Sequence, residues 1–235
     1  MATIKALSTK KLQPSFLNAA AEHNIEIIEK EFISIRPVES ERLPFLGALA
    51  SMKDLPVAFT SANAVESVHG ALEEEELMDV QWTLYCLSGK TMEVAVQCFP
   101  NSSIAATADN AAALATVILL DEVKDLLFFC GDRRRDELPR ILEAGGVEVS
   151  EVIVYNTVVT PHLLEDKPDV VLFFSPSAVE GFFSVNQLKE DAVCLAIGGT
   201  TAEAITGHTT NKVIISEAPS PEMMLAALLK TSGVL

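Results

Sequence analysis

Short apolar runs and longer amphipathic stretches alternate along this chain from one end to the other. Each run is rich in Val, Ile, Leu and Phe and closes in a turn of small residues. A helical pattern then follows, with apolar positions three or four residues apart. This alternation predicts parallel β-sheets covered by helices. We expect strands near residues 3–8, 56–60, 83–87, 103–106, 125–130, 169–174, 192–197 and 212–215.

Eight strand-helix units could form one closed barrel or two smaller sheets, and internal repeats favour two sheets. Three consecutive units recur in the same order, roughly 110 residues further on. The repeated pairs are VAFTSANAVE at 57–66 with VLFFSPSAVE at 171–180, CLSGKTMEVA at 86–95 with AIGGTTAEAI at 196–205, and IAATADNAAALA at 104–115 with IISEAPSPEMMLA at 214–226. With the first units described next, the chain is a four-unit module written twice.

The first unit of each module also matches its counterpart, at 4–35 and 126–158, and ends in a long β-prone tail. The tails, at 25–38 and 147–159, are extended and charged at alternate positions, as expected of strands that leave one sheet and continue elsewhere. They suit the two passes of a linker between domains. Periodicity leaves open whether each module folds on itself or the two modules exchange their first units.

Composition narrows the class of protein. Hydrophobic residues make up 49% of the chain but aromatic residues only 6%, which is typical of helices packed on buried parallel strands. No apolar run approaches the roughly 18 residues that span a bilayer, and the N-terminus lacks a secretory pattern. Four widely spaced cysteines suggest buried free thiols. We expect a cytoplasmic protein that does not bind membranes.

A net charge of −16 argues against nucleic acid as a partner, because binding to phosphates needs a basic face. Exposed charges are screened beyond about 8 Å at physiological salt. An acidic substrate would therefore depend on local hydrogen-bond donors rather than on the overall field.

Polar residues gather where the repeated strands end. Ligands of open parallel sheets bind beyond the carboxyl ends of the strands, where helix N-termini present unpaired N–H groups. For each residue alone, an ordinary helix N-cap is the simpler interpretation. Two such rims that face one another would form an anion-binding cleft. The candidates are Thr60, Ser61, Asn63 and Ser88 in the first module and Ser175, Ser177, Gly198, Thr200 and Thr201 in the second.

Basic residues lie in the equivalent strand-to-helix turns STKK at 8–11 and GDRRR at 131–135. The helix dipole disfavours cations at a helix start, so a ligand would explain them, although a solvated basic turn remains the alternative. Lys10 and Arg135 are the candidates from these turns. The four histidines show no metal-ligand spacing, and the chain has no GxSxG, GxGxxG or Walker motif. Neither a metal nor a nucleotide cofactor is therefore expected.

Tyr155 ends the run EVIVY in the second tail, where the chain is expected to pass between domains. Packing is the ordinary role of a tyrosine in a strand. By contrast, Tyr85 lies inside the apolar run WTLYCL and is expected to belong to the core.

These motifs together resemble the uroporphyrinogen-III synthase family over nearly the whole chain. The resemblance is carried, in the family's order and spacing, by FTSANAV at 59–65, CGDRRRDEL followed by LEAGGVEVSEVIVYNT, FFSPSAVEGF at 173–182, AIGGTTAEAI and APSPEMMLAAL. Each motif alone is loose, but five in order are specific. STKK stands where the family commonly has a Thr-Arg-Pro turn, and Ser88 stands where the second module has Gly198, which places the roles of Lys10 and Ser88 in question.

The resemblance implies a cofactor-free lyase with two similar flavodoxin-like α/β domains, and we expect the protein to be a monomer. Residues 1–35 and 163–235 would form one domain, residues 40–152 the other, and strands within 33–39 and 153–162 would join them. The implied hydro-lyase reaction closes the linear tetrapyrrole octacarboxylate hydroxymethylbilane into uroporphyrinogen III, with loss of water and inversion of ring D.

The same resemblance implies that Tyr155 is the general acid and that the polar rims bind the substrate. Phenols have a reference pKa of about 10 and so carry a proton at neutral pH. The alternative function is a non-catalytic bilobal protein that binds or senses a small anionic ligand such as a tetrapyrrole. Conversion of hydroxymethylbilane distinguishes the two.

Overall fold

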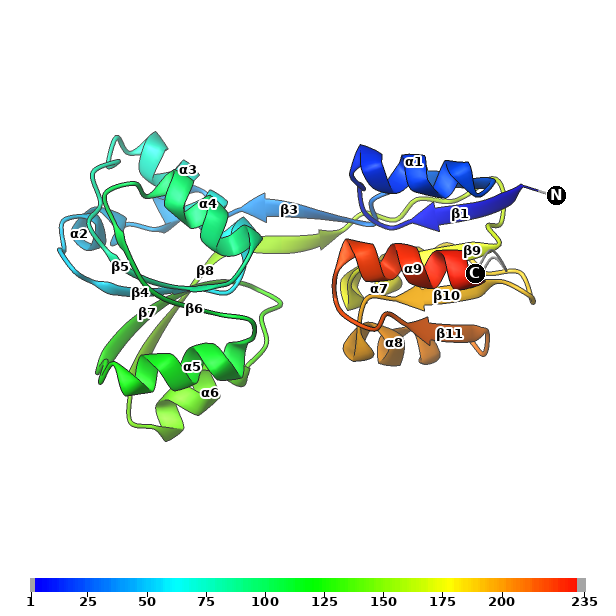
Figure 1. Cartoon of the computed structure of the whole chain (residues 1–235). Coiled ribbons are helices and arrows are strands. Elements are labelled where there is room, and N and C mark those ends of the chain that lie inside the picture. The colour runs from blue at the N-terminus through cyan, green and yellow to red at the C-terminus, as the bar shows by residue number, and fades with distance from the viewer. Residues whose placement is uncertain (1–2, 232–235) are drawn as a thin grey trace. The chain divides into compact units, whose positions relative to one another are not determined.

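The computed structural model describes residues 3–231, which form two compact units (Figure 1). The first unit comprises the described residues up to Ser34 together with those from Val158 onward, and the second comprises Ile35–Thr157. Each unit contains a mostly parallel β-sheet with helices on both faces. The eight strands expected from the apolar runs are all present, and the expected α/β class is confirmed.

The sheet of the first unit has the strand order β2-β1-β9-β10-β11. Its strands are β1 (Ile4–Ser8), β2 (Ile25–Glu29), β9 (Val170–Phe173), β10 (Val193–Ala196) and β11 (Lys212–Ile215). Its helices are α1 (Pro14–Glu22), α7 (Pro176–Phe183), α8 (Gly199–Thr206) and α9 (Pro221–Thr231). In Figure 1 the blue β1 lies beside strands from the far end of the chain.

The sheet of the second unit has the order β3-β8-β7-β4-β5-β6. Its strands are β3 (Ile33–Pro37), β4 (Pro56–Phe59), β5 (Thr83–Leu87), β6 (Ser103–Ala108), β7 (Asp125–Gly131) and β8 (Glu148–Val159). Its helices are η1 (Ser40–Arg42), α2 (Leu46–Ala50), α3 (Ala62–Glu74), α4 (Lys90–Cys98), α5 (Ala111–Leu120) and α6 (Glu137–Ala144). Apart from β3, the order β8-β7-β4-β5-β6 repeats that of the first unit and is the doubly wound, flavodoxin-like order.

The two modules exchange their first units, which answers the question that periodicity left open. β1, from the first module, pairs in parallel with β9 of the second, with Leu7 beside Val171. In the same way β7, from the second module, pairs with β4 of the first, with Leu127 beside Val57. Each sheet therefore combines strands from both copies of the repeat.

Period-two alternation places opposite faces of each strand in different cores. In β9, Val171 and Phe173 pack with α7 and α8, whereas Val170 and Leu172 pack with α1 and α9. The second unit repeats this division, with α3 and α4 on one face of the sheet and α5 and α6 on the other. Tyr85 is 3% exposed, as expected of a core residue, and burial and a hydrogen bond to Asp121 raise its pKa to about 12.

The two β-prone tails differ in the structure. The second is one continuous strand, β8, over nearly the whole expected range of 147–159, so Tyr155 lies within the strand, four residues before its end. The first is divided into β2 and β3, because the fully buried Phe32 interrupts it and packs edge-to-face against Phe182.

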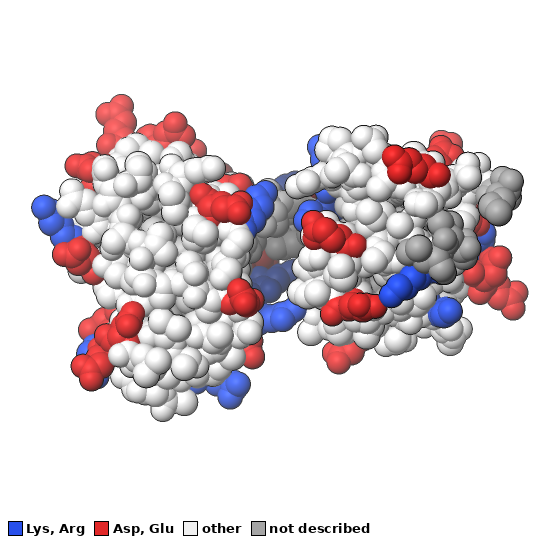
Figure 2. Space-filling view, in the orientation of Figure 1, with Lys and Arg blue, Asp and Glu red and all other residues white. Residues whose placement is uncertain are grey.

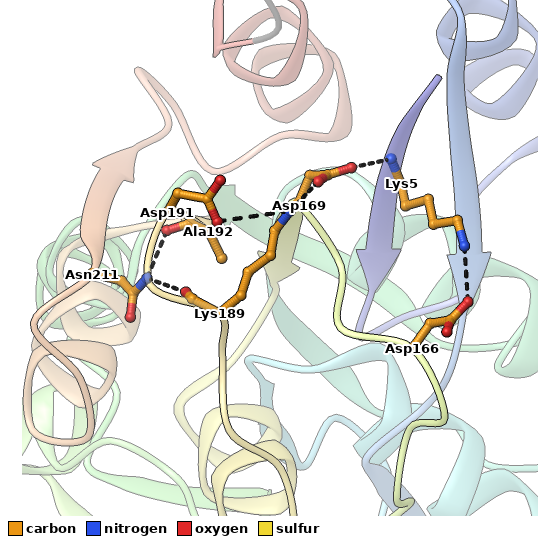
Figure 3. Close-up of polar contacts among 7 residues, drawn as sticks. All are labelled: Lys5, Asp166, Asp169, Lys189, Asp191, Ala192 and Asn211. Carbon is orange, nitrogen blue, oxygen red and sulfur yellow. Dashed lines mark hydrogen bonds and ion pairs between the residues drawn. The ribbon is translucent and has the colours of Figure 1, made fainter. Parts of the chain in front are cut away.

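Polar contacts join the amino ends of the strands in the first unit (Figure 3). Asp169, just before β9, accepts a 2.6 Å hydrogen bond from the Lys5 N–H and forms an ion pair with Lys189. Asn211 Nδ2 donates to the carbonyl oxygens of Lys189 and Ala192, each at 2.9 Å. These contacts lie at the edge opposite the repeated polar turns and stabilise the fold rather than a binding site.

Candidate functional site

The strand order creates one topological switch point in each sheet. In the second unit, β4 leads into α3 and β7 leads into α6, and these helices cover opposite faces. The chain therefore leaves the adjacent carboxyl ends of β4 and β7 toward opposite faces of the sheet, which opens a space between the two turns. Ligands of doubly wound sheets bind at such a point.

Tyr155 reaches this point from β8. Its hydroxyl donates a hydrogen bond to Ser61 Oγ at 3.3 Å, and both residues are half-buried. Ser61 is the N-cap of α3, and its Oγ also accepts the Asn63 N–H at 3.2 Å. The N-cap interpretation of Ser61 is thus confirmed, and the same oxygen holds the tyrosine hydroxyl beside the N-terminus of the helix.

Two residues that sequence analysis did not select hold Tyr155 in place. Gly131 ends β7 opposite Tyr155, and a β-carbon at Gly131 would lie 2.3 Å from Tyr155 Cζ. The Asp132 N–H donates to the Tyr155 carbonyl oxygen at 3.1 Å, and Asp132 Oδ1 accepts the Thr157 N–H at 2.8 Å. A glycine that closes an apolar strand run was the available signal, since it marks a bulge or a close approach.

The switch point of the first unit is built differently. Ser175 is the N-cap of α7 and accepts the Ala178 N–H at 3.2 Å, as Ser61 caps α3. The buried Thr9 Oγ1 donates to the Leu172 carbonyl oxygen at 3.0 Å and accepts the Phe174 N–H at 3.3 Å. Lys10 is exposed, and its Nζ lies 5.6 Å from the centroid of the Phe174 ring.

The remaining predicted residues also lie where strands give way to helices. Thr60 directly follows β4, and Asn63 lies in the first turn of α3. Ser88 is exposed between β5 and α4, and its N–H donates to the Ala108 carbonyl oxygen at 2.8 Å. In the first unit, Gly198 is the N-cap of α8, Thr200 and the 2% exposed Thr201 follow it, and Ser177 lies in the first turn of α7.

In the basic turn after β7, Arg134 is held by carboxylate partners. Arg134 forms ion pairs with Glu151 of β8 and with Asp136, the N-cap of α6. For Arg134, therefore, neighbouring carboxylates explain a cation at a helix start. Arg135 is exposed in the same turn and is placed by the structure beyond the end of β7.

Several other features bear on the kind of site. Figure 2 shows acidic side chains spread over the visible face of each unit. Within residues 3–231, no group of three or more His, Cys, Asp or Glu side chains could hold a metal ion, and no helix is long and apolar enough to cross a membrane. A cavity of about 300 Å³ between β11 and α9 contains none of the predicted residues.

Comparison with known proteins agrees with this fold. A family model described as uroporphyrinogen-III synthase HemD matches residues 15–226. Uroporphyrinogen-III synthase of Saccharomyces cerevisiae is 27% identical over 207 aligned positions, which cover 73% of this chain and 74% of that protein. The protein of the same name from Chlorobaculum parvum is 27% identical, and the alignment covers 98% of this chain and 100% of that protein.

Solved structures extend the likeness to the whole fold. The crystal structure of uroporphyrinogen-III synthetase from Helicobacter pylori superimposes with a TM-score of 0.68 at 20% identity, covering 98% of this chain and 100% of that one. A mutant uroporphyrinogen III synthase from Thermus thermophilus gives a TM-score of 0.59 at 16% identity and covers 98% of each chain. The family and enzyme class expected from the sequence are confirmed: this chain belongs to the uroporphyrinogen-III synthase family, the cyclising hydro-lyases of haem biosynthesis.

Proposed function

We propose that the chain closes hydroxymethylbilane into uroporphyrinogen III and that Tyr155 is the general acid of this reaction. One observation supports this role above the others. The Tyr155 hydroxyl lies at the switch point of the second unit, 3.3 Å from the N-cap oxygen of α3. It is thereby directed to the edge of the sheet where ligands of this fold class bind.

The chemistry requires a proton donor at the leaving oxygen. When the hydroxymethyl C–O bond breaks, the phenol gives its proton to that oxygen and water departs. A delocalised cation remains on the bilane, and a phenolate remains on Tyr155. The cation closes on ring D through a spiro intermediate that inverts the ring. The cyclised product then releases one proton, which restores the phenol and balances the reaction as bilane to macrocycle plus water.

The substrate's eight carboxylates need hydrogen-bond donors. We propose that N–H groups and hydroxyls after the strands of both units supply them, around Thr60, Ser61 and Asn63 in one unit and Ser175 and Ser177 in the other. Ser88, Gly198, Thr200 and Thr201 extend these two sets, and Lys10 and Arg135 add positive charge. Helix N-termini stabilise anions without a full cationic charge, which fits a chain with a net charge of −16.

Positioning accounts for the choice of isomer. The bilane can also close without inversion, so the enzyme must hold the chain in the conformation that presents ring D for attack. Fixing reactive groups in a near-attack arrangement lowers the activation free energy of the favoured pathway by several kcal/mol. Well-oriented intramolecular reactions gain about 7–11 kcal/mol in this way.

Exchange of Tyr155 for Phe tests the assignment. We expect the rate of type III product to fall at least about tenfold, because the phenyl ring keeps its packing but cannot donate a proton. The measurement incubates hydroxymethylbilane with enzyme and separates the type I and type III isomers. Tyr85→Phe is the matched control, since it removes the chain's other tyrosine hydroxyl from a core site, and its turnover should stay within about twofold of wild type.

The possible results separate the proposals. Unchanged turnover in Tyr155→Phe would remove Tyr155 from the acid role while leaving the activity itself in place. A wild-type protein that binds tetrapyrroles but forms no type III isomer would instead support the non-catalytic binder.

We also propose that the enzyme acts as a monomer in the cytoplasm. All four cysteines are free thiols, and three of them are buried, which suits a reducing compartment.

A further inference from the structure

The ladder that carries Tyr155 is longer than its counterpart in the other unit. In the first unit the β1–β2 pairing ends with Ser8 beside Glu29. Ser8 also pairs with Leu172 of β9, and Phe128 pairs with Ala58 of β4, which is the position of the repeat that corresponds to Leu172. In the second unit the pair equivalent to Ser8 and Glu29 is therefore Phe128 beside Glu151. From that pair the β7–β8 ladder continues to Gly131 and Tyr155. The position of Tyr155 is therefore a feature of the second unit alone.

A bulge turns Tyr155 toward the α3 face of the sheet. Val152 and Val154 of β8 both pack in the core beneath α3 and α4, so simple alternation would place Tyr155 on the opposite face. The register shifts between Cys130 and Gly131, so that Gly131 pairs with Tyr155 and Val154 is skipped. Such bulges re-aim a side chain. Tyr155 consequently packs against the same core as Val154, on the side where Ser61 caps α3.

The tyrosine ring then occupies the volume that a side chain at position 131 would need. Because paired residues of neighbouring strands point to the same face, the missing β-carbon of Gly131 lies directly under the ring. A β-carbon there would meet Tyr155 Cζ at 2.3 Å, Cε2 at 2.5 Å and the hydroxyl oxygen at 2.7 Å. Every one of these atoms belongs to the reactive end of the side chain.

We propose that Gly131 is a positioning residue: its lack of a side chain makes room for the Tyr155 ring and lets the hydroxyl reach Ser61. The inference rests on the proposed role of Tyr155 and deepens it. It assigns the placement of the acid to a position that has no side chain of its own and is two residues from the nearest basic side chain of the turn.

The geometry makes this testable without loss of the fold. The φ angle of Gly131 lies outside the left-handed region that favours glycine, so alanine is compatible with the backbone. The three nearest contacts of the added methyl group are all with the far end of one side chain. In Gly131→Ala the ring is therefore displaced, while β7 and β8 can keep their pairing.

The experiment compares Gly131→Ala with wild type in kinetics and in NMR of protein labelled with ¹³C at tyrosine Cζ. The chain contains two tyrosines, so the spectrum has two signals, which Tyr85→Phe assigns. We expect the Tyr155 signal to move and the Tyr85 signal to stay. We expect kcat to fall at least about tenfold with KM changed less than about twofold, since small misplacement of a reacting group is costly.

Gly70→Ala is the matched control, because Gly70 lies within α3 of the same unit and an added β-carbon there meets nothing within 4 Å. Its kcat should stay within about twofold of wild type. In a Tyr155→Phe background, Gly131→Ala should lower kcat no further, because both changes act through one hydroxyl.

An unmoved Tyr155 signal would overturn the inference, and so would an equal loss of kcat in the Tyr155→Phe background. Neither result would touch the proposed acid role of Tyr155, which stands or falls on the Tyr155→Phe variant alone.

Discussion

At the scale of single residues, the repeated serines are equivalent as helix caps but have different neighbours. Ser61 and Ser175 each accept an N–H from the first turn of the helix that follows. Only Ser61 also accepts a tyrosine hydroxyl, and at the first unit's switch point Thr9 bonds to the main chain of β9. The repeated phrase thus preserves a helix N-terminus in both units, while the proposed acid lies in one.

If the polar residues at these two helix starts also bind carboxylates, Thr60→Ala and Ser175→Ala should each raise the KM for hydroxymethylbilane by about tenfold. This is the loss expected for one hydrogen bond to a charged group, about 1.4 kcal/mol. Initial rates over a range of substrate concentrations give the KM values. Thr201→Ala is a weaker test, because Thr201 is almost fully buried and its removal also disturbs packing.

Asn110→Ala separates binding from capping. Asn110 caps α5 by accepting the Ala113 N–H at 2.9 Å but is not among the proposed binding residues. Its loss should cost about 1 kcal/mol of stability and leave KM unchanged. Wild-type KM values in both Thr60→Ala and Ser175→Ala would place the carboxylate contacts elsewhere.

At the scale of elements, Asp169 joins β1 to β9 where the exchanged modules meet. It accepts the Lys5 N–H, and its own N–H donates to the Lys5 carbonyl oxygen at 2.7 Å. The hydrogen bond from Lys189 is the main cause that lowers the pKa of the Asp169 carboxyl, and burial opposes it. This stabilisation is fully present above the pKa of an aspartate in the unfolded chain, about 3.9, and is lost as the pH falls through the lower pKa of Asp169 in the folded state.

Asp169→Asn should therefore lower the free energy of unfolding by about 1 kcal/mol at pH 7, and by less at pH 3. The figure is small because 37% of the Asp169 side chain is exposed and water screens the pair. Urea denaturation at both pH values measures it. Asp166→Asn is the control: Asp166 also pairs with a lysine, but its side chain is 70% exposed, so no measurable change is expected. An Asp169→Asn deficit that persists undiminished at pH 3 would contradict the ionic explanation.

At the scale of the whole molecule, the chain crosses from the first unit to the second in β3 and returns in β8. Each hydrophobic cluster of described residues nevertheless lies inside one unit. Two clusters fall within residues 35–157, and the other two draw on both ends of the chain. The core of the second unit is thus complete in one continuous segment.

We expect residues 35–157, expressed alone, to fold with a cooperative thermal transition followed by circular dichroism. The fragment 158–235 should remain unfolded, because it lacks β1 and α1, whose Leu7 and Phe16 complete its cores. Joining residues 1–34 to the C-terminal end of that fragment should restore folding. A fragment 35–157 without a cooperative transition would show that the two units depend on each other for stability.

Much of the fold could be predicted because its signals are local. Apolar runs located the eight strands, and small polar residues after them located the N-caps Ser61 and Ser175. The division of the first tail at Phe32 was not predictable, because whether that side chain is buried depends on α7 packing from far along the chain. The catalytic and binding roles of all the predicted site residues, Lys10, Ser88 and Arg135 among them, remain predictions.

The sequence by itself determined the α/β class, the duplication and the family, since each depends on patterns within a few tens of residues or on motif order. Only the tertiary structure decided that the modules exchange their first units, because both pairings satisfy the same apolar pattern. It also decided where Tyr155 points. A one-residue register shift between β7 and β8 places the ring over Gly131 and its hydroxyl at Ser61. Such a shift depends on contacts between strands and leaves no periodic trace in the sequence.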